Sequence, residues 1–189
     1  MYSFKFTGFI LGSKEWQEKD KLISVLTKEK GKIKLLAKGV RNPRSKRVGN
    51  LETGNLIRGI AFVNDKNNIP ILGEIKLILQ PLSKRKNLVY TTLLLYISEL
   101  IDKLVVESQG EKKIFEFYKK TLFKLTKTNN IESAVRFSVE LPNLLGFGIS
   151  KTAKQFLEKG KIKDAQKAAE RYIENISEKR ITSLQLIRK

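Results

Sequence analysis

Hydrophobic and polar residues alternate with a period near two over the first 80 residues. Tyr2, Phe4 and Phe6 alternate with polar neighbours, and the apolar run Phe9-Ile10-Leu11 follows. This pattern predicts a half-buried β-strand. The same criterion predicts strands at 2–11, 22–27, 32–37, 55–63 and 69–79. Short strands with no long helix among them favour a small closed barrel, because closure removes the exposed strand edges.

The period changes to 3.6 residues after Pro81, which indicates amphipathic helices. Apolar stripes at that spacing predict helices at 89–104, 114–125, 131–141, 152–157 and 162–176, with a further short helix near 181–189. Pro142 is expected to end or kink the third helix, because proline lacks an amide hydrogen and clashes with the preceding turn. We therefore predict a multi-domain α+β chain, with a barrel domain at 1–80 and an all-α helical domain at 81–189.

The composition excludes several kinds of site. The 189 residues include no cysteine and no histidine, so a disulfide, a zinc site of the Cys/His type and a histidine base are all ruled out. The carboxylates are scattered and usually lie beside lysine, whereas a magnesium-dependent nuclease needs them clustered. We expect a protein that is not an enzyme and that uses no cofactor, with a metal-dependent nuclease as a disfavoured alternative.

The net charge points to a polyanionic partner. Lys and Arg total 38 against 19 Asp and Glu, a formal net charge of +19. Such an excess attracts nucleic acid above all. The start of the chain lacks the pattern of a signal peptide, and the apolar stretch 88–104 is interrupted by charged residues, so no membrane span is expected. A cytoplasmic, nucleoid-associated protein is the corresponding expectation.

The segment from Lys30 to Arg47 carries the strongest local signal, because it contains eight cations and no acid. Lys32 and Lys34 alternate with apolar residues on the third predicted strand, so they should face away from the core. Gly39 and Pro43 disfavour regular structure, so the part from residue 38 onward is predicted to be a mobile basic loop. The predicted DNA-binding residues are Lys32, Lys34, Lys38, Arg41, Arg44, Lys46 and Arg47.

Aromatic residues of the first half are a second, weaker signal. Phe4 and Phe6 lie on the apolar stripe of the first strand, where core packing is the expected role. Trp16 falls in the polar stretch 13–18, which is interpreted as a loop. An indole in that position could stack on a nucleic-acid base or pack against the neighbouring domain, and the sequence leaves both open.

These residues resemble the RecO family of recombination mediators over nearly the whole chain. The amino-terminal resemblance rests on Gly8-Phe9-Ile10-Leu11, Glu18-Lys19-Asp20, Leu26 to Lys32, Ala37 to Arg41, and Ser45. In the second half, Leu93 to Leu104 resembles the first helix of that family's helical domain. Phe137 to Leu145 with Gly146-Phe147-Gly148 resembles its leucine-leucine-glycine-aromatic junction, and 179–184 resembles its usual end.

The resemblance implies an oligonucleotide-binding (OB-fold) barrel followed by a helical domain. It also implies a protein that binds single- and double-stranded DNA, anneals complementary strands and helps load recombinase. The partners that it implies are RecR and the acidic, hydrophobic-ended tail of single-strand binding protein. That tail would bind the helical half, which has 22 basic and 12 acidic residues.

One departure from the family concerns zinc. Many relatives carry four cysteines just after the junction, whereas residues 149–156 contain none. We expect no zinc module, and a shortened or helical segment in its place. The charge and the barrel would serve an RNA-binding or ribosome-associated protein equally well, which is the main alternative from the residues alone.

Overall fold

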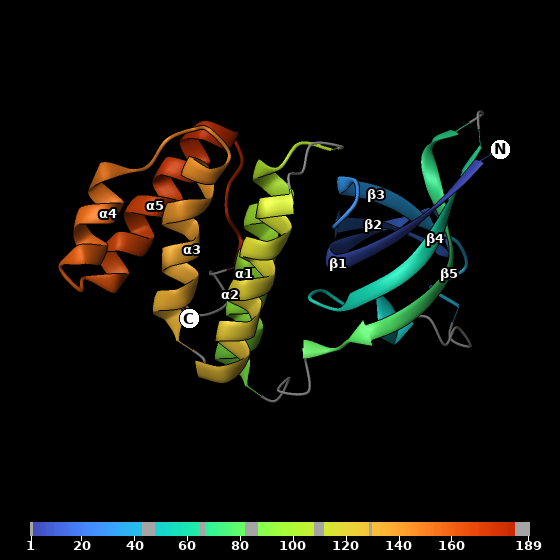
Figure 1. Ribbon diagram of the computed structural model, residues 1–189, viewed down its shortest axis with the longest axis horizontal. Coiled ribbons are helices and arrows are strands. Elements are labelled where there is room, and N and C mark those ends of the chain that lie inside the picture. The colour runs from blue at the N-terminus through green and yellow to red at the C-terminus, as the bar shows by residue number, and fades with distance from the viewer. Residues whose placement is uncertain are drawn as a thin grey trace. The chain divides into compact units, whose positions relative to one another are not determined.

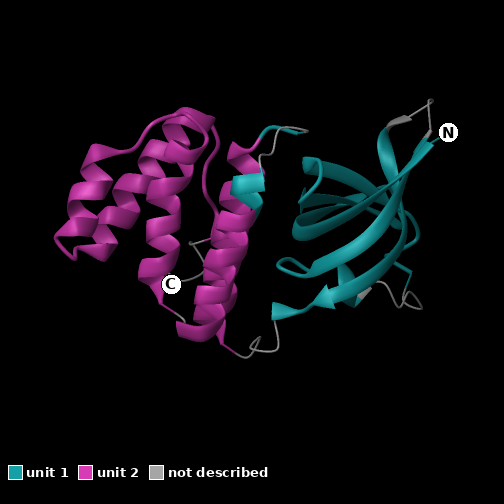
Figure 2. Cartoon of the chain, in the orientation of Figure 1, with its two compact units in different colours: residues 1–83, 106–115 teal, residues 84–105, 116–189 magenta. Residues whose placement is uncertain are grey.

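A computed structural model describes residues 2–42, 48–64, 67–81, 87–107, 112–128 and 130–183. The chain forms two compact units, shown in different colours in Figure 2. The barrel unit comprises residues 1–83 and 106–115, and the helical unit comprises residues 84–105 and 116–189. A segment from the second half of the sequence therefore belongs to the barrel unit.

The barrel unit is a closed five-stranded barrel with strand order β1-β2-β3-β5-β4 (Figure 1). The strands are β1 (Tyr2–Trp16), β2 (Asp20–Thr27), β3 (Gly31–Ala37), β4 (Leu56–Asn64) and β5 (Asn67–Leu79). All neighbouring pairs are antiparallel except β3 with β5, which pair in parallel at Leu36 and Ile71. The predicted OB-fold barrel is confirmed.

β1 closes the barrel by pairing with two neighbours. Its first half pairs with β4 from Tyr2 to Phe9, and its second half pairs with β2 from Gly8 to Trp16. The register shifts between Ile10 and Gly12. A bulge of this kind bends a strand and increases its twist, which lets one strand serve both sides of a small barrel.

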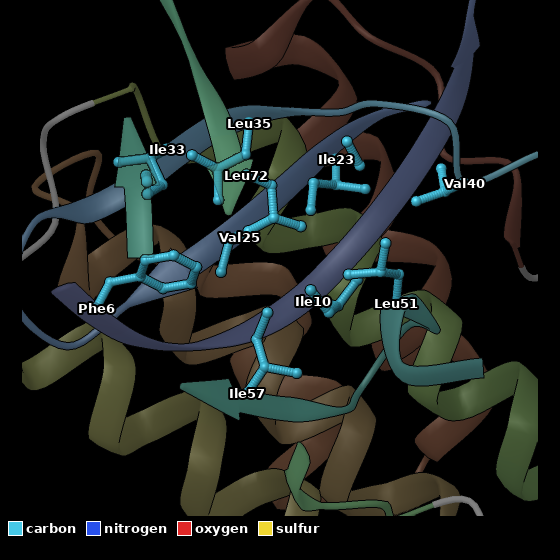
Figure 3. Packing of buried hydrophobic residues seen from close by; sticks show 12 residues of the cluster. Phe6, Ile10, Ile23, Val25, Ile33, Leu35, Val40, Leu51, Ile57 and Leu72 are labelled. Atoms are coloured by element: carbon cyan, nitrogen blue, oxygen red, sulfur yellow. The ribbon is translucent and has the colours of Figure 1, made fainter. Parts of the chain in front are cut away.

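The barrel interior is filled by apolar side chains at alternate strand positions (Figure 3). Phe6, Ile10, Val25, Leu35 and Ile57 are each at most 1% exposed. Burial of such a side chain contributes about 1.5–3 kcal/mol. The predicted core role of Phe6 is therefore confirmed.

The helices are α1 (Leu88–Leu104), α2 (Lys112–Thr128), α3 (Ile131–Leu144), α4 (Lys151–Glu158) and α5 (Ile162–Ser177). They form the helical unit, except that the first turn of α2 belongs to the barrel unit. Side chains cap several of these helices: Asn87, Asn130 and Ser150 accept hydrogen bonds from amides of the first turn. Such caps satisfy amides that have no partner within the helix. Among the residues described, no helix is both long and apolar enough to cross a membrane.

The region after the junction is helical, as expected. α4 and α5 pack against α3 through a cluster that includes Val135, Ala153, Leu157 and Ala169. α3 continues through Pro142 and ends at Leu144, so the observed end of this helix lies close to the predicted one. Pro142 lies in the last turn, where its missing amide removes one hydrogen bond and leaves little helix beyond it to redirect.

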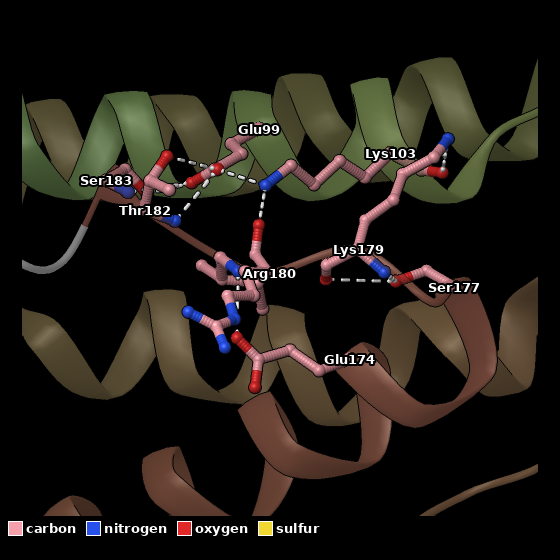
Figure 4. Close-up of polar contacts among 9 residues, drawn as sticks. Glu99, Lys103, Glu174, Ser177, Lys179, Arg180, Thr182 and Ser183 are labelled. Atoms are coloured by element: carbon pink, nitrogen blue, oxygen red, sulfur yellow. Dashed lines mark hydrogen bonds and ion pairs between the residues drawn. The ribbon is translucent and has the colours of Figure 1, made fainter.

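The last described residues lie along α1, where Glu99 holds them (Figure 4). The Glu99 carboxylate accepts hydrogen bonds from the amide and hydroxyl of Thr182 at 2.9 and 2.8 Å, and from those of Ser183 at 2.9 and 2.5 Å. Lys103 Nζ donates to the same carboxylate at 2.5 Å. Burial raises the pKa of Glu99, but the hydrogen bonds from Lys103, Ser183 and Thr182 outweigh it and lower the pKa to about 2. We call this contact the Glu99 clamp.

Candidate nucleic-acid interface

The two predicted cations of β3 lie on the outer face of the strand, opposite the core residue Ile33. They differ in accessibility. Lys32 is buried, with 6% of its surface exposed, and its backbone forms an isolated parallel bridge with Glu107. Lys32, one of the predicted DNA-binding residues, therefore exposes little of its surface in the structure.

Lys34 is more accessible than Lys32, with 37% of its side chain exposed. Its Nζ forms an ion pair with the Glu107 carboxylate. An ion pair between exposed groups contributes only about 0–1 kcal/mol. A phosphate oxygen could therefore replace the Glu107 carboxylate at a modest energetic cost.

The predicted mobile loop begins instead as an anchored turn. After β3, Gly39 adopts a φ of +66°, and its amide donates to Asp20 Oδ1 at 2.8 Å. The Arg41 amide donates to the Lys19 carbonyl at 3.0 Å. Val40 is 1% exposed and belongs to the barrel core. Residues 38–42 are thus held against the β1–β2 hairpin rather than free, because Val40 is apolar and the hairpin supplies acceptors.

The other predicted DNA-binding cations lie in this turn or follow it along the chain. Lys38 and Arg41 are exposed, and Arg41 Nη2 lies 3.1 Å from Glu15 Oε1. Arg44, Lys46 and Arg47 lie outside the described residues. Among the described residues of the predicted site, Lys34 pairs with Glu107 and Arg41 pairs with Glu15, although the segment 30–47 itself contains no acid.

A groove of about 660 Å³ lies in the barrel unit. Its lining combines aromatic, aliphatic and cationic side chains: Tyr2, Phe4, Lys14, Trp16, Leu22, Lys30, Ile33, Lys34, Val63, Ile69, Pro70 and Glu107. We call it the barrel groove. Of the predicted site residues that the structure describes, Lys34 lines it, whereas Lys32, Lys38 and Arg41 do not.

Several residues of the barrel groove have positions that the sequence did not predict. Trp16 is the last residue of β1 and 37% exposed, not part of a loop. Phe4 packs only partly against the core, and Lys30 Nζ lies 4.8 Å from its ring centroid. Lys14 and Tyr2 were not predicted as site residues. Tyr2 shares the period-two stripe of Phe4 and Phe6, whereas no buried face marks the strand around Lys14 in the sequence.

Among the residues described, no group of three or more Asp or Glu side chains is arranged to hold a metal ion. The described cations offer charge to phosphate oxygens, and the described aromatic rings offer faces on which bases can stack.

Comparison with known proteins identifies the family. The model described as "Recombination protein O N terminal" matches residues 1–81, and that described as "Recombination protein O C terminal" matches residues 85–156. A protein named DNA repair protein RecO from Chloroherpeton thalassium is 28% identical over 169 residues, covering 86% of this chain and 65% of the relative. A protein of the same name from Prosthecochloris aestuarii is 26% identical over 145 residues, which cover 76% of this chain and 55% of the relative.

The chain spans 55% and 65% of the lengths of these two relatives. Among solved structures, the S. pombe Stn1–Ten1 complex matches with a TM-score of 0.33 and 17% identity, over 51% of this chain and 76% of that one. A TM-score that low supports no argument about fold or function. The amino-terminal and carboxy-terminal family models match the first and second parts of the chain in that order, and both relatives are named DNA repair protein RecO. The chain therefore belongs to the RecO family of DNA repair proteins.

Proposed function

We propose that this protein binds single- and double-stranded DNA through its barrel unit and acts as a non-enzymatic recombination mediator. In this role it anneals complementary strands and helps load recombinase onto DNA coated by single-strand binding protein. The observation that carries the proposal is an anchored cationic turn on an OB-fold barrel, in a chain of net charge +19 that belongs to a DNA repair family.

The mechanism needs no bond-making step. Cations from 38 to 47 neutralise phosphates on two strands, so the repulsion between the strands falls and complementary bases can meet. Counterions released from the DNA drive the binding, which therefore weakens steeply as salt increases. Phosphate contacts of this kind position DNA without reading its sequence, as a protein that anneals any pair of complementary strands requires.

Two protein partners belong to the same proposal: RecR, and the acidic, hydrophobic-ended tail of single-strand binding protein. The helical unit would bind the tail, since an excess of basic residues in the second half of the chain favours an acidic peptide. A pull-down with a peptide of the last residues of single-strand binding protein tests this. A peptide with its acidic residues replaced by amides is the control.

The cationic segment is tested by replacing Arg44, Lys46 and Arg47 together with Ala. Removing a cation that neutralises one phosphate should reduce the salt slope of log K by about 0.9 for duplex DNA and about 0.7 for single strands. We expect weaker binding to both, with the duplex slope reduced by up to about 2.7 if each cation neutralises one phosphate. Arg41 is kept because it also pairs with Glu15.

The matched control replaces Lys159, Lys163 and Lys167 with Ala. These exposed lysines are near or on α5, so the control loses the same net charge from a different unit. If both triple variants change the salt slope equally, the effect comes from total charge and the site assignment is wrong. Measuring affinity for RNA of the same length and salt distinguishes a DNA-binding protein from an RNA-binding one.

A further inference from the structure

We propose that the barrel groove binds unpaired bases of single-stranded DNA and is a second DNA site, separate from the cationic turn. This inference rests on the proposed function, because it assumes that DNA reaches the barrel unit. It goes further by assigning the binding of unpaired bases to residues other than those that neutralise phosphates. The turn neutralises phosphates of either form, whereas the groove accepts only bases whose faces are open.

Three aromatic rings line the groove, and each is at least partly exposed to solvent. Tyr2 is 61% exposed and Trp16 is 37% exposed. Phe4 packs partly against the core and also lines the groove. Bases stack on such faces with little sequence preference, since every base has a π surface.

Cations lie beside the rings, as a nucleic-acid strand requires. Lys14, Lys30 and Lys34 all line the groove, and Lys30 lies over the Phe4 ring. The barrel groove has a volume of about 660 Å³, within the range of roughly 300–1,000 Å³ found for sites that enclose small organic molecules. Paired bases are covered above and below by their neighbours in the stack. A duplex therefore cannot offer a base to these rings without unstacking it.

Glu107 places a negative charge in the groove. It is the one acidic residue among the described residues that line the groove, and it is paired with Lys34. A carboxylate there repels phosphates and occupies a cation that a strand would use. Glu107 should therefore limit single-strand affinity, and its removal should strengthen binding, an effect that a damaged fold would not produce.

The test compares binding of a labelled single-stranded oligothymidine and a blunt duplex of equal length, by fluorescence anisotropy at fixed salt. Trp16→Ala should weaken single-strand binding roughly 5- to 150-fold, the range for removal of one stacked base. Its duplex affinity should stay within about 2-fold, because the phosphate contacts are retained. Phe123→Ala, which removes an exposed ring of the helical unit, is the control.

Glu107→Gln should raise single-strand affinity by about 2- to 5-fold, as expected for removal of one exposed ion pair. The control is Glu116→Gln, which breaks the 3.6 Å ion pair to Lys119 on α2. Equal loss of single-strand and duplex binding in Trp16→Ala, or unchanged single-strand affinity in both groove variants, overturns the groove inference. Failure of the wild-type protein to bind either DNA overturns the proposed function instead.

Discussion

The Glu99 clamp offers a quantitative test of how the end of the described chain is held. Glu99→Gln keeps the size of the side chain but replaces one acceptor oxygen with an NH₂ donor. Glu99 accepts from two amides, two hydroxyls and an ammonium group, all of which are donors. The new NH₂ would face some of these donors, so at least one would be left without its acceptor.

The expected magnitude follows from the pKa of Glu99. Its fall from 4.5 to about 2 corresponds to about 3 kcal/mol in favour of the folded state at neutral pH, at roughly 1.4 kcal/mol per pKa unit. The side chain is only 14% exposed, so solvent screens little of this. The contribution is complete above pH 4.5, the unfolded value, and is lost as the pH falls through the folded pKa of about 2.

Urea unfolding followed by circular dichroism at 222 nm measures the effect on the helical transition. At pH 7 the free energy of unfolding of Glu99→Gln should be about 3 kcal/mol lower than that of the wild type. At pH 3 this difference should be about 2 kcal/mol smaller. Other carboxylates titrate in both proteins and cancel in the difference. Glu140→Gln, at an exposed position of α3, should change stability by less than about 0.5 kcal/mol. If Glu99→Gln differs from the wild type by less than about 1 kcal/mol in free energy of unfolding, with no dependence on pH, the reasoning is refuted.

Two further substitutions test the turn and the helical core. Gly39→Ala should destabilise the barrel transition in urea by about 1–2 kcal/mol, because its φ of +66° disfavours a Cβ although no atom lies within 4 Å of one; a neutral result would contradict the left-handed turn. Tyr118→Phe should cost about 1 kcal/mol, because the buried Tyr118 hydroxyl lies 2.7 Å from Ser98 Oγ. Adding Ser98→Ala should cost less in this background than in the wild type, and equal costs would show that the two hydroxyls do not interact.

The barrel was predictable where one face of a strand is buried. Phe4 and Phe6 are more buried than the polar residues Ser3 and Lys5, and this contrast marks the start of the first strand. The end of β1 was missed because residues from Ser13 to Trp16 are exposed on both faces. Without a buried face the period-two signal disappears, although pairing with β2 continues to Asp20.

The site was less predictable because its accessibility depends on contacts between distant parts of the sequence. The alternation on β3 places Lys32 and Lys34 on the outer face, but it carries no information about Glu107, whose backbone bridges to Lys32 and whose carboxylate pairs with Lys34. The anchored turn was missed for a similar reason. Local composition around Gly39 indicates a loop, whereas its attachment depends on Asp20 and on Val40 entering the core.

The position of Trp16 has a practical consequence. It is the single tryptophan of the 189 residues, and it lines the barrel groove. Indole emission depends on the polarity around the ring and on stacking partners, so the unlabelled protein carries its own optical reporter at this location. Its emission spectrum can reveal when the groove fills, and stopped-flow recording can time that event separately from phosphate capture.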